Sequence, residues 1–182
     1  MCPRPALPMR FEYIILGLIR RQPAHGYELL QDWNQPSHIG MIWQVKSGLL
    51  YAALDKLNQL GFLEASLVSG QAAPQKKEYH ITPAGEEVFL EWMRTPVAAV
   101  RDFRQDFLSR LFFAPNVDPG LMADLISHQK SICQGWLNSL ENQCKNSAGF
   151  EQQVLIFRIH QARSILEWLE EPFYIDHHTK EK

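Results

Sequence analysis

The segment 47–60, SGLLYAALDKLNQL, constrains the fold most, because as an α-helix it divides its residues between two faces. The apolar face gathers Leu49, Leu50, Ala53, Leu54, Leu57 and Leu60. The polar face gathers Ser47, Tyr51, Asp55 and Asn58. Ser47 is predicted as the N-cap, beside Lys46. An exposed tyrosine, a lysine and a helix N-terminus suit a phosphate backbone and a groove, although a surface helix whose tyrosine covers a neighbour fits the same pattern.

Two shorter helices are predicted before this segment. Apolar residues at helical spacing indicate one helix over 10–20, and Pro23 closes that stretch. A second helix is predicted over 26–33, ahead of a loop rich in small and polar residues. Three short helices joined by turns, with the third two-faced, predict a helix-turn-helix.

The residues after the third helix predict a wing. Gly61 ends that helix, and alternating residues in 62–68 and 77–81 indicate two strands around a loop with Gly and Pro. A further helix is expected to start with Thr82 as its N-cap and Pro83 in its first turn. The fold class is therefore mainly α, with an N-terminal winged helix-turn-helix of three helices and a two-stranded wing.

The second half of the chain predicts a helical dimerisation region. Helices are expected over 102–113, 119–146 and 150–170, with Asp118 as the N-cap of the long middle one. The last helix is apolar over a wide arc, so one flank can pack on its hairpin partner while the other meets a second subunit. The predicted dimerisation residues are Leu125, Ile132, Leu155, Ile159, Ala162, Leu166 and Leu169. A second apolar row comprises Val154, Phe157, Ile165 and Trp168, and burial within one subunit is the alternative.

Composition limits the partners and the class of function. The 182 residues carry a net charge of −2, and residues 1–100 hold nine basic and nine acidic side chains, so contact with nucleic acid must rest on a local patch. Three cysteines indicate free thiols in a reducing compartment, and no apolar run is long enough for a membrane span, so we expect a cytoplasmic protein with no membrane partner. No catalytic motif or metal-ligand spacing appears, so we expect no enzyme, cofactor or metal.

Four regions follow from these patterns. A flexible N-terminal arm is expected over 1–9, where Met1 and Met9 are both candidate starts. The winged helix is expected over 10–95, the helical dimerisation domain over 96–175 and a polar tail over 176–182. The tryptophans Trp92, Trp136 and Trp168 fall on three helices that could converge into a pocket for a small aromatic effector. Tryptophans at helical spacing also fill cores, and the sequence leaves both readings open.

Several stretches together resemble the PadR-like transcriptional regulators over roughly residues 10–94. They are GYEL at 26–29, Trp43, GLLY at 48–51, LGFL at 60–63 and KKEYHITPAG at 76–85. The closing half resembles longer PadR-like and virulence-activator proteins in length and helical character only. The resemblance implies a homodimeric DNA-binding regulator, usually a repressor, whose third helix enters the major groove of double-stranded DNA while the wing touches the flanking backbone.

The resemblance assigns DNA contacts residue by residue. The DNA-binding set is Lys46, Ser47, Gly48, Tyr51, Lys76 and Lys77, to which the polar face of the third helix adds Asn58. Leu49 stands where the family usually has Ser or Thr, so one phosphate contact is expected to be missing. Tyr27, Trp43 and Tyr79 are expected as core. The competing hypothesis is a winged-helix module that binds a protein partner and no DNA.

Overall fold

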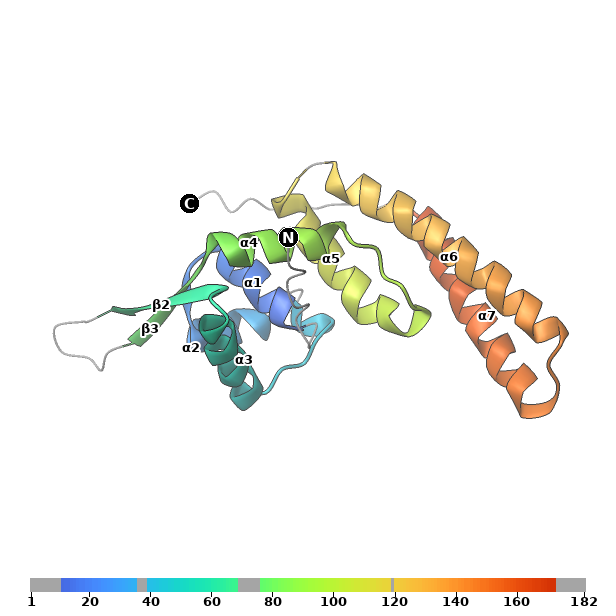
Figure 1. The fold of residues 1–182 in the computed structure, drawn as a ribbon, viewed down its shortest axis with the longest axis horizontal. Coiled ribbons are helices and arrows are strands. Elements are labelled where there is room, and N and C mark those ends of the chain that lie inside the picture. The colour runs from blue at the N-terminus through green and yellow to red at the C-terminus, as the bar shows by residue number, and fades with distance from the viewer. Residues whose placement is uncertain (1–10, 36–38, 69–75, 119, 173–182) are drawn as a thin grey trace. The chain divides into compact units, whose positions relative to one another are not determined.

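The computed structural model describes residues 11–35, 39–68, 76–118 and 120–172, and the predicted arm (1–9) and tail (176–182) lie outside this range (Figure 1). The chain divides into two compact units, Met1–Thr95 and Pro96–Lys182. The first unit contains α1 (Phe11–Arg21), β1 (Ala24–His25), α2 (Gly26–Trp33), a 3₁₀ turn (Ile39–Met41), α3 (Ser47–Gln59), β2 (Leu63–Val68), β3 (Lys76–Ile81) and α4 (Pro83–Arg94).

The first unit is a winged helix-turn-helix, as the sequence predicts. In Figure 1, α1 lies between α4 and α3, and it contacts both. Leu50, Leu54 and Leu57 of α3 are fully buried, which leaves the opposite face of that helix to solvent. Strands β2 and β3 pair antiparallel from Leu63 opposite Ile81 onward and extend away from the helices as the predicted wing (Figure 1).

A third strand, β1, was not predicted. It has only two residues, Ala24 and His25, which pair with Tyr79 and Glu78 of β3, so the sheet order is β1-β3-β2. A two-residue strand is too short to show alternation in a sequence. Its consequence is that the start of α2 is hydrogen-bonded directly to the wing.

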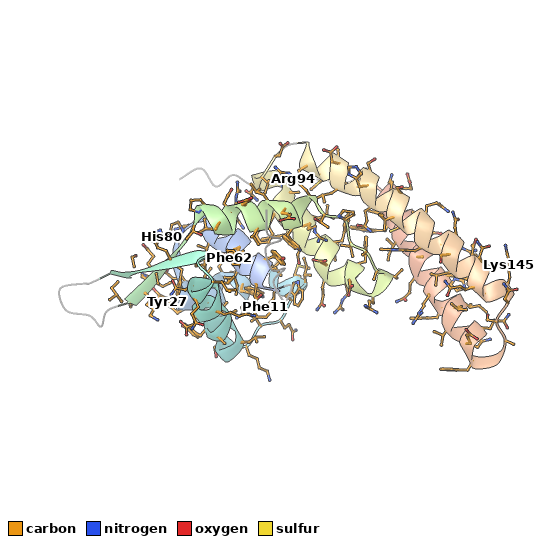
Figure 2. The ribbon with its side chains drawn as sticks, in the orientation of Figure 1. Phe11, Tyr27, Phe62, His80, Arg94 and Lys145 are labelled. Atoms are coloured by element: carbon orange, nitrogen blue, oxygen red, sulfur yellow. The ribbon has the colours of Figure 1, made fainter. Side chains whose placement is uncertain are left out.

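Gly85 explains how α4 is joined to the wing. A Cβ at this position would overlap the carbonyl oxygen of Phe62 (labelled in Figure 2), so only glycine permits the close approach. The Oγ1 of Thr82 accepts from the Gly85 amide (3.1 Å) and donates to the Gly61 carbonyl (2.7 Å). The predicted N-cap Thr82 is confirmed, and it holds both the first turn of α4 and the end of the α3–β2 turn.

The second unit consists of short helical turns and a long hairpin. A 3₁₀ turn (Val100–Asp102), a π turn (Phe103–Phe107), α5 (Leu108–Phe113) and a 3₁₀ turn (Ala114–Asn116) replace the single helix predicted over 102–113. The π turn allows the Phe103 and Phe107 rings to stack, with centroids 4.6 Å apart. Asp118 was predicted as the next N-cap; it instead accepts from the Gly120 amide (2.7 Å), one residue before that helix begins.

The hairpin is formed by α6 (Leu121–Lys145) and α7 (Gly149–Glu170), which lie side by side (Figure 1). The predicted dimerisation residues lie on its inner side. Leu125, Leu155, Ile159, Ala162 and Leu169 are buried within the single chain, and Ile132 and Leu166 are half-buried. The most exposed apolar residues of α7 are Phe157 of the neighbouring row, 62% exposed, and Phe150, 85% exposed, whereas Ile156 outside that row is 36% exposed.

Candidate nucleic-acid interface

The first turn of α3 presents a polar, exposed surface. Lys46, not Ser47, occupies the N-cap position in extended backbone, and its carbonyl accepts from the amides of Leu49 and Leu50. The N-cap prediction for Ser47 was therefore off by one residue. Lys46, Ser47 and Gly48 are all exposed, so a basic side chain and a hydroxyl stand at the positive end of the helix dipole.

The Tyr51 ring packs against the start of α2, which begins with glycine. A Cβ on Gly26 would lie 2.5 Å from Cε1 of Tyr51, so the ring lies against the bare backbone of α2. The other side of the ring is open, and Tyr51 is 44% exposed, which confirms the exposure predicted for it. Gly26 at the start of α2 therefore seats this ring.

Helix α3 is also held from its inner side. Lys56 Nζ lies 2.9 Å from Oε1 of Glu12, whose side chain is buried on α1. A buried carboxylate requires such a partner, because a charge without one is costly in an apolar environment. The pair therefore holds α3 against α1 while leaving its polar face clear. Asn58 is exposed at the far end of that face, and its contact with DNA stays a prediction.

Both wing lysines lie on β3, opposite Val68 and Leu67 at the far end of the paired strands; they are exposed and have partners within the first unit. Lys77 Nζ lies 3.6 Å from Oδ1 of Asp55 on α3. Lys76 Nζ lies 4.9 Å from the ring centroid of Tyr27 on α2, a distance at which a cation is attracted to an aromatic face. The seven predicted residues are thus all exposed: Lys46 precedes α3, Ser47, Gly48, Tyr51 and Asn58 lie on α3, and Lys76 and Lys77 lie on β3. We call these seven residues the candidate DNA surface.

Tyr27 was expected in the core, and this expectation was wrong. The residue is 42% exposed, beside Lys76 of β3; Figure 2 labels it. Its hydroxyl donates to Oε1 of Glu28 (3.0 Å), and its ring lies parallel to that of His25. The hydrogen bond to the Glu28 carboxylate raises the pKa of the Tyr27 hydroxyl. Tyr79 is buried and Trp43 half-buried, so for Tyr79 the core expectation is confirmed.

Glu28 and His25 join the start of α2 to the wing. The His25 amide donates to Oε2 of Glu28 (2.9 Å), a hydrogen bond that lowers the pKa of this carboxyl. His25 Nδ1 lies 2.9 Å from the carbonyl oxygen of Lys77; because a carbonyl can only accept, the imidazole donates here. A movement of the wing is therefore coupled to the first turn of α2.

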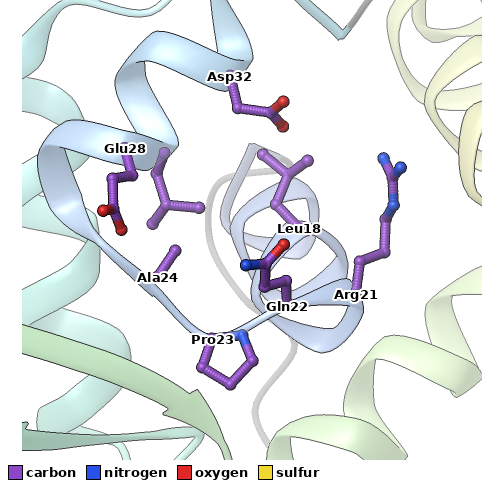
Figure 3. A pocket seen from close by; sticks show the side chains of 8 residues that line it. Leu18, Arg21, Gln22, Pro23, Ala24, Glu28 and Asp32 are labelled. Atoms are coloured by element: carbon purple, nitrogen blue, oxygen red, sulfur yellow. The ribbon is translucent and has the colours of Figure 1, made fainter. Parts of the chain in front are cut away.

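A depression of about 430 Å³ lies between the end of α1 and the start of α2 (Figure 3). Figure 3 shows the carboxylates of Glu28 and Asp32 and the guanidinium of Arg21 around Leu18. Glu28 already accepts from His25 and Tyr27, so its role here is the capping just described. The depression contains none of the candidate DNA surface.

The three tryptophans predicted for an effector pocket each have packing partners. Trp92 is buried and stacks on Tyr13 in the first unit, with centroids 5.2 Å apart. In the second unit, Trp136 donates to the Ala98 carbonyl and lines a cavity of about 300 Å³, whereas Trp168 meets the Phe103 and Phe107 rings edge-on. The effector pocket stays a prediction, and these contacts also suit ordinary packing.

The comparison with protein families decides the classification. Residues 15–91, which span the winged helix from α1 to α4, match the family described as "Transcriptional regulator PadR-like family". Over these residues the chain belongs to this family. The resemblance carried by the GYEL, GLLY and KKEYHITPAG stretches is thereby confirmed, and with it the assignment as a transcriptional regulator.

Individual PadR-like relatives are distant. The "Negative transcriptional regulator PadR" of Bacillus subtilis is 24% identical over 130 residues, which are 71% of this chain and 70% of that protein. A probable transcriptional regulator of Mycobacterium tuberculosis is 26% identical over 101 residues, 56% of this chain and 52% of that one. A crystal structure of Bacillus subtilis PadR in complex with operator DNA is 21% identical and covers 89% of this chain and 96% of that chain, with a TM-score of 0.48.

Within the described residues, no helix has the length and apolar character to cross a membrane.

Proposed function

We propose that this chain is a homodimeric repressor that binds a palindromic operator in double-stranded DNA. The observation that carries the proposal is the half-exposed Tyr51 ring, which Gly26 seats on the open face of α3 beside Lys46 and the wing lysines. Membership of the PadR-like family supports the same reading.

The two parts of the candidate DNA surface would act differently. Tyr51 and Asn58 project from the face of α3 that would enter the major groove, where base edges distinguish sequences. Lys76 and Lys77 would neutralise phosphates of the flanking backbone, which adds affinity without sequence preference. Leu49 is 43% exposed at the edge of this face and offers no hydroxyl to a phosphate.

The second copy would pack on the outer row of α7. Its members, Phe150, Val154, Phe157, Gln161, Ile165 and Trp168, repeat at three- and four-residue intervals on a flank of α7 beside the buried row, and Trp168 also meets the Phe103 and Phe107 rings of its own chain. The row is symmetric about Gln161, because apolar residues stand four and seven positions to each side of it. Two copies crossing antiparallel at Gln161 would therefore set Phe157 against the partner's Ile165, and a two-fold axis of this kind implies a palindromic operator.

Regulation would act through the spacing of the two winged helices. Recognition of both half-sites needs two copies of α3 about 34 Å apart, one turn of the double helix. A small aromatic effector or a protein partner would weaken binding by favouring a dimer with another spacing. Trp92, Trp136 and Trp168 are the candidate residues for receiving an aromatic effector.

The test is a mobility-shift titration of the full chain on its own promoter region at two salt concentrations. We expect affinity to fall steeply with salt, and Lys76→Ala/Lys77→Ala to weaken binding to all duplexes while reducing the slope of log K against log salt by about 0.9 for each phosphate left without its lysine. Tyr51→Ala should also change the preference between duplexes. Lys145→Ala, an exposed lysine at the end of α6 (Figure 2), is the matched control and should change neither. Absence of duplex binding even at low salt would contradict the proposal and favour the protein-interaction module.

A further inference from the structure

Asp55 places a negative charge in the middle of the candidate DNA surface. It follows Tyr51 by one helical turn on the exposed face of α3, and its side chain is 58% exposed. The surface must approach phosphates, which repel a carboxylate. Asp55 is therefore unfavourable for binding DNA in general.

The partner of Asp55 is one of the two wing lysines. Oδ1 of Asp55 lies 3.6 Å from Nζ of Lys77, whose side chain is 56% exposed. Ion pairs between side chains as exposed as these contribute little to the free energy of folding, so stabilising the fold does not explain this pair. Its effect on binding is larger, because Lys77 must leave Asp55 before it can neutralise a phosphate.

Once Lys77 has moved, the carboxylate needs another donor. A carboxylate only accepts hydrogen bonds, and in the major groove the amino group of cytosine is the donor that acidic side chains contact. Opposite the acceptor atoms of guanine or thymine, Asp55 would remain without a partner. The same residue thus lowers affinity for most sequences and is compensated only on some.

We propose that Asp55 is a specificity-determining residue that holds Lys77 in the free protein and accepts from a cytosine amino group on the operator. This inference rests on the proposed function, because it assumes that α3 enters the major groove. Asp55 should affect DNA affinity in the opposite direction to the lysines. Removing the Asp55 charge should strengthen binding to unrelated DNA, whereas removing a lysine should weaken it.

The experiment compares Asp55→Asn with Glu91→Gln in the full chain. Both changes remove one acidic charge from an exposed helix position, and Glu91 lies on α4, which α1 separates from α3 (Figure 1). The probes are a duplex selected by the wild-type protein from a random pool and a scrambled duplex of the same composition. We expect Asp55→Asn to bind the scrambled duplex about tenfold more tightly with a salt slope steeper by about 0.9. Preference for the selected duplex should fall about tenfold or more, and Glu91→Gln should match the wild type.

A second readout separates the two roles of Asp55. In a Lys77→Ala background, Asp55→Asn should gain less affinity for the scrambled duplex, because no lysine is released. Selection repeated with Asp55→Asn should lose a cytosine preference at one position in each half-site. An Asp55→Asn variant indistinguishable from Glu91→Gln, or an unchanged selected motif, would overturn this inference while leaving DNA binding intact. A wild-type protein that selects no duplex would overturn the proposed function, and this inference with it.

Discussion

The two units both leave aromatic rings in solvent, but these rings have different neighbours. Around Tyr51 of the first unit stand lysines, a serine and the first turn of a helix, whereas Phe150 and Phe157 of the second unit continue an apolar row. An aromatic ring surrounded by lysines suits DNA, because the ring can contact base edges while the lysines neutralise phosphates. A row of apolar side chains at helical spacing suits another helix. The neighbours of an exposed ring therefore distinguish the two surfaces better than the ring itself does.

The largest expected effect concerns two glycines, one in each unit. Gly85→Ala should destabilise the first unit by about 3 kcal/mol, because the new methyl group meets the Phe62 carbonyl and backbone cannot move aside cheaply. Gly135→Ala on α6 has open space and should instead stabilise its helix by about 0.5–1 kcal/mol. Urea unfolding of both variants measures this. Equal shifts in the two variants would contradict the close approach at Gly85.

The next effect concerns the apolar row. Phe157→Glu should weaken the dimer by about 2 kcal/mol, roughly 30-fold in its dissociation constant, because a charge would be buried at the proposed interface. Ile156→Glu is the matched control, since Ile156 is an exposed apolar residue of the same helix that points away from the row. Sedimentation of both variants over a range of concentrations gives the answer. A dimer weakened equally by the two changes would place the interface elsewhere.

A smaller effect tests the seat of Tyr51. Gly26→Ala should displace the ring and lower operator affinity about tenfold, because Cβ would lie 2.5 Å from Cε1 of Tyr51. Folding stability should change little, since the displaced group is the end of a side chain. In a Tyr51→Ala background, Gly26→Ala should have no further effect on affinity. An additive loss in the double variant would mean that Gly26 acts on DNA binding through another route.

The smallest expected effect concerns the Cys133 thiol, which is buried in the α6–α7 hairpin. Burial raises the pKa of the Cys133 thiol, so this thiol stays neutral in the folded protein at pH values where an unfolded one ionises. Its contribution to stability is therefore present below the ordinary thiol pKa and is lost as the pH rises above it. Iodoacetamide at pH 8 should label the half-exposed Cys144 before Cys133, with mass spectrometry locating the adduct. Equal labelling of Cys133 would show that α6 and α7 separate in solution.

Patterns several residues long were sufficient to predict most of the first unit. The two-faced repeat of α3 and the Thr82–Pro83 start of α4 specify local structure, and both are confirmed. The close approach of Gly85 to Phe62 was not predictable, because it depends on residues brought together only by the fold. Tyr27 was misassigned for a related reason: its partners, Lys76 on β3 and His25 on β1, come together only when β1 pairs with β3.

In the second unit the sequence could not choose between two apolar rows. The row containing Phe157 is shifted by two residues along the sequence from the row containing Leu155. Both rows have the spacing of a helix interface. Only the position of α6 shows that the first row is internal. The segment predicted as a helix over 102–113 is helical from Phe103 to Phe113, but its first five residues form a π turn, which the helical period of 3.6 residues does not reveal.

Selection from a random duplex pool by the full-length wild-type chain, followed by sequencing, tests most directly whether two copies of the Tyr51 face read one duplex. We predict an inverted repeat whose half-sites are centred about 10 base pairs apart. That motif should disappear with Tyr51→Ala but not with Lys145→Ala. Enrichment of no sequence, or of a motif without two-fold symmetry that Tyr51→Ala leaves unchanged, would contradict a dimer that reads DNA through this face.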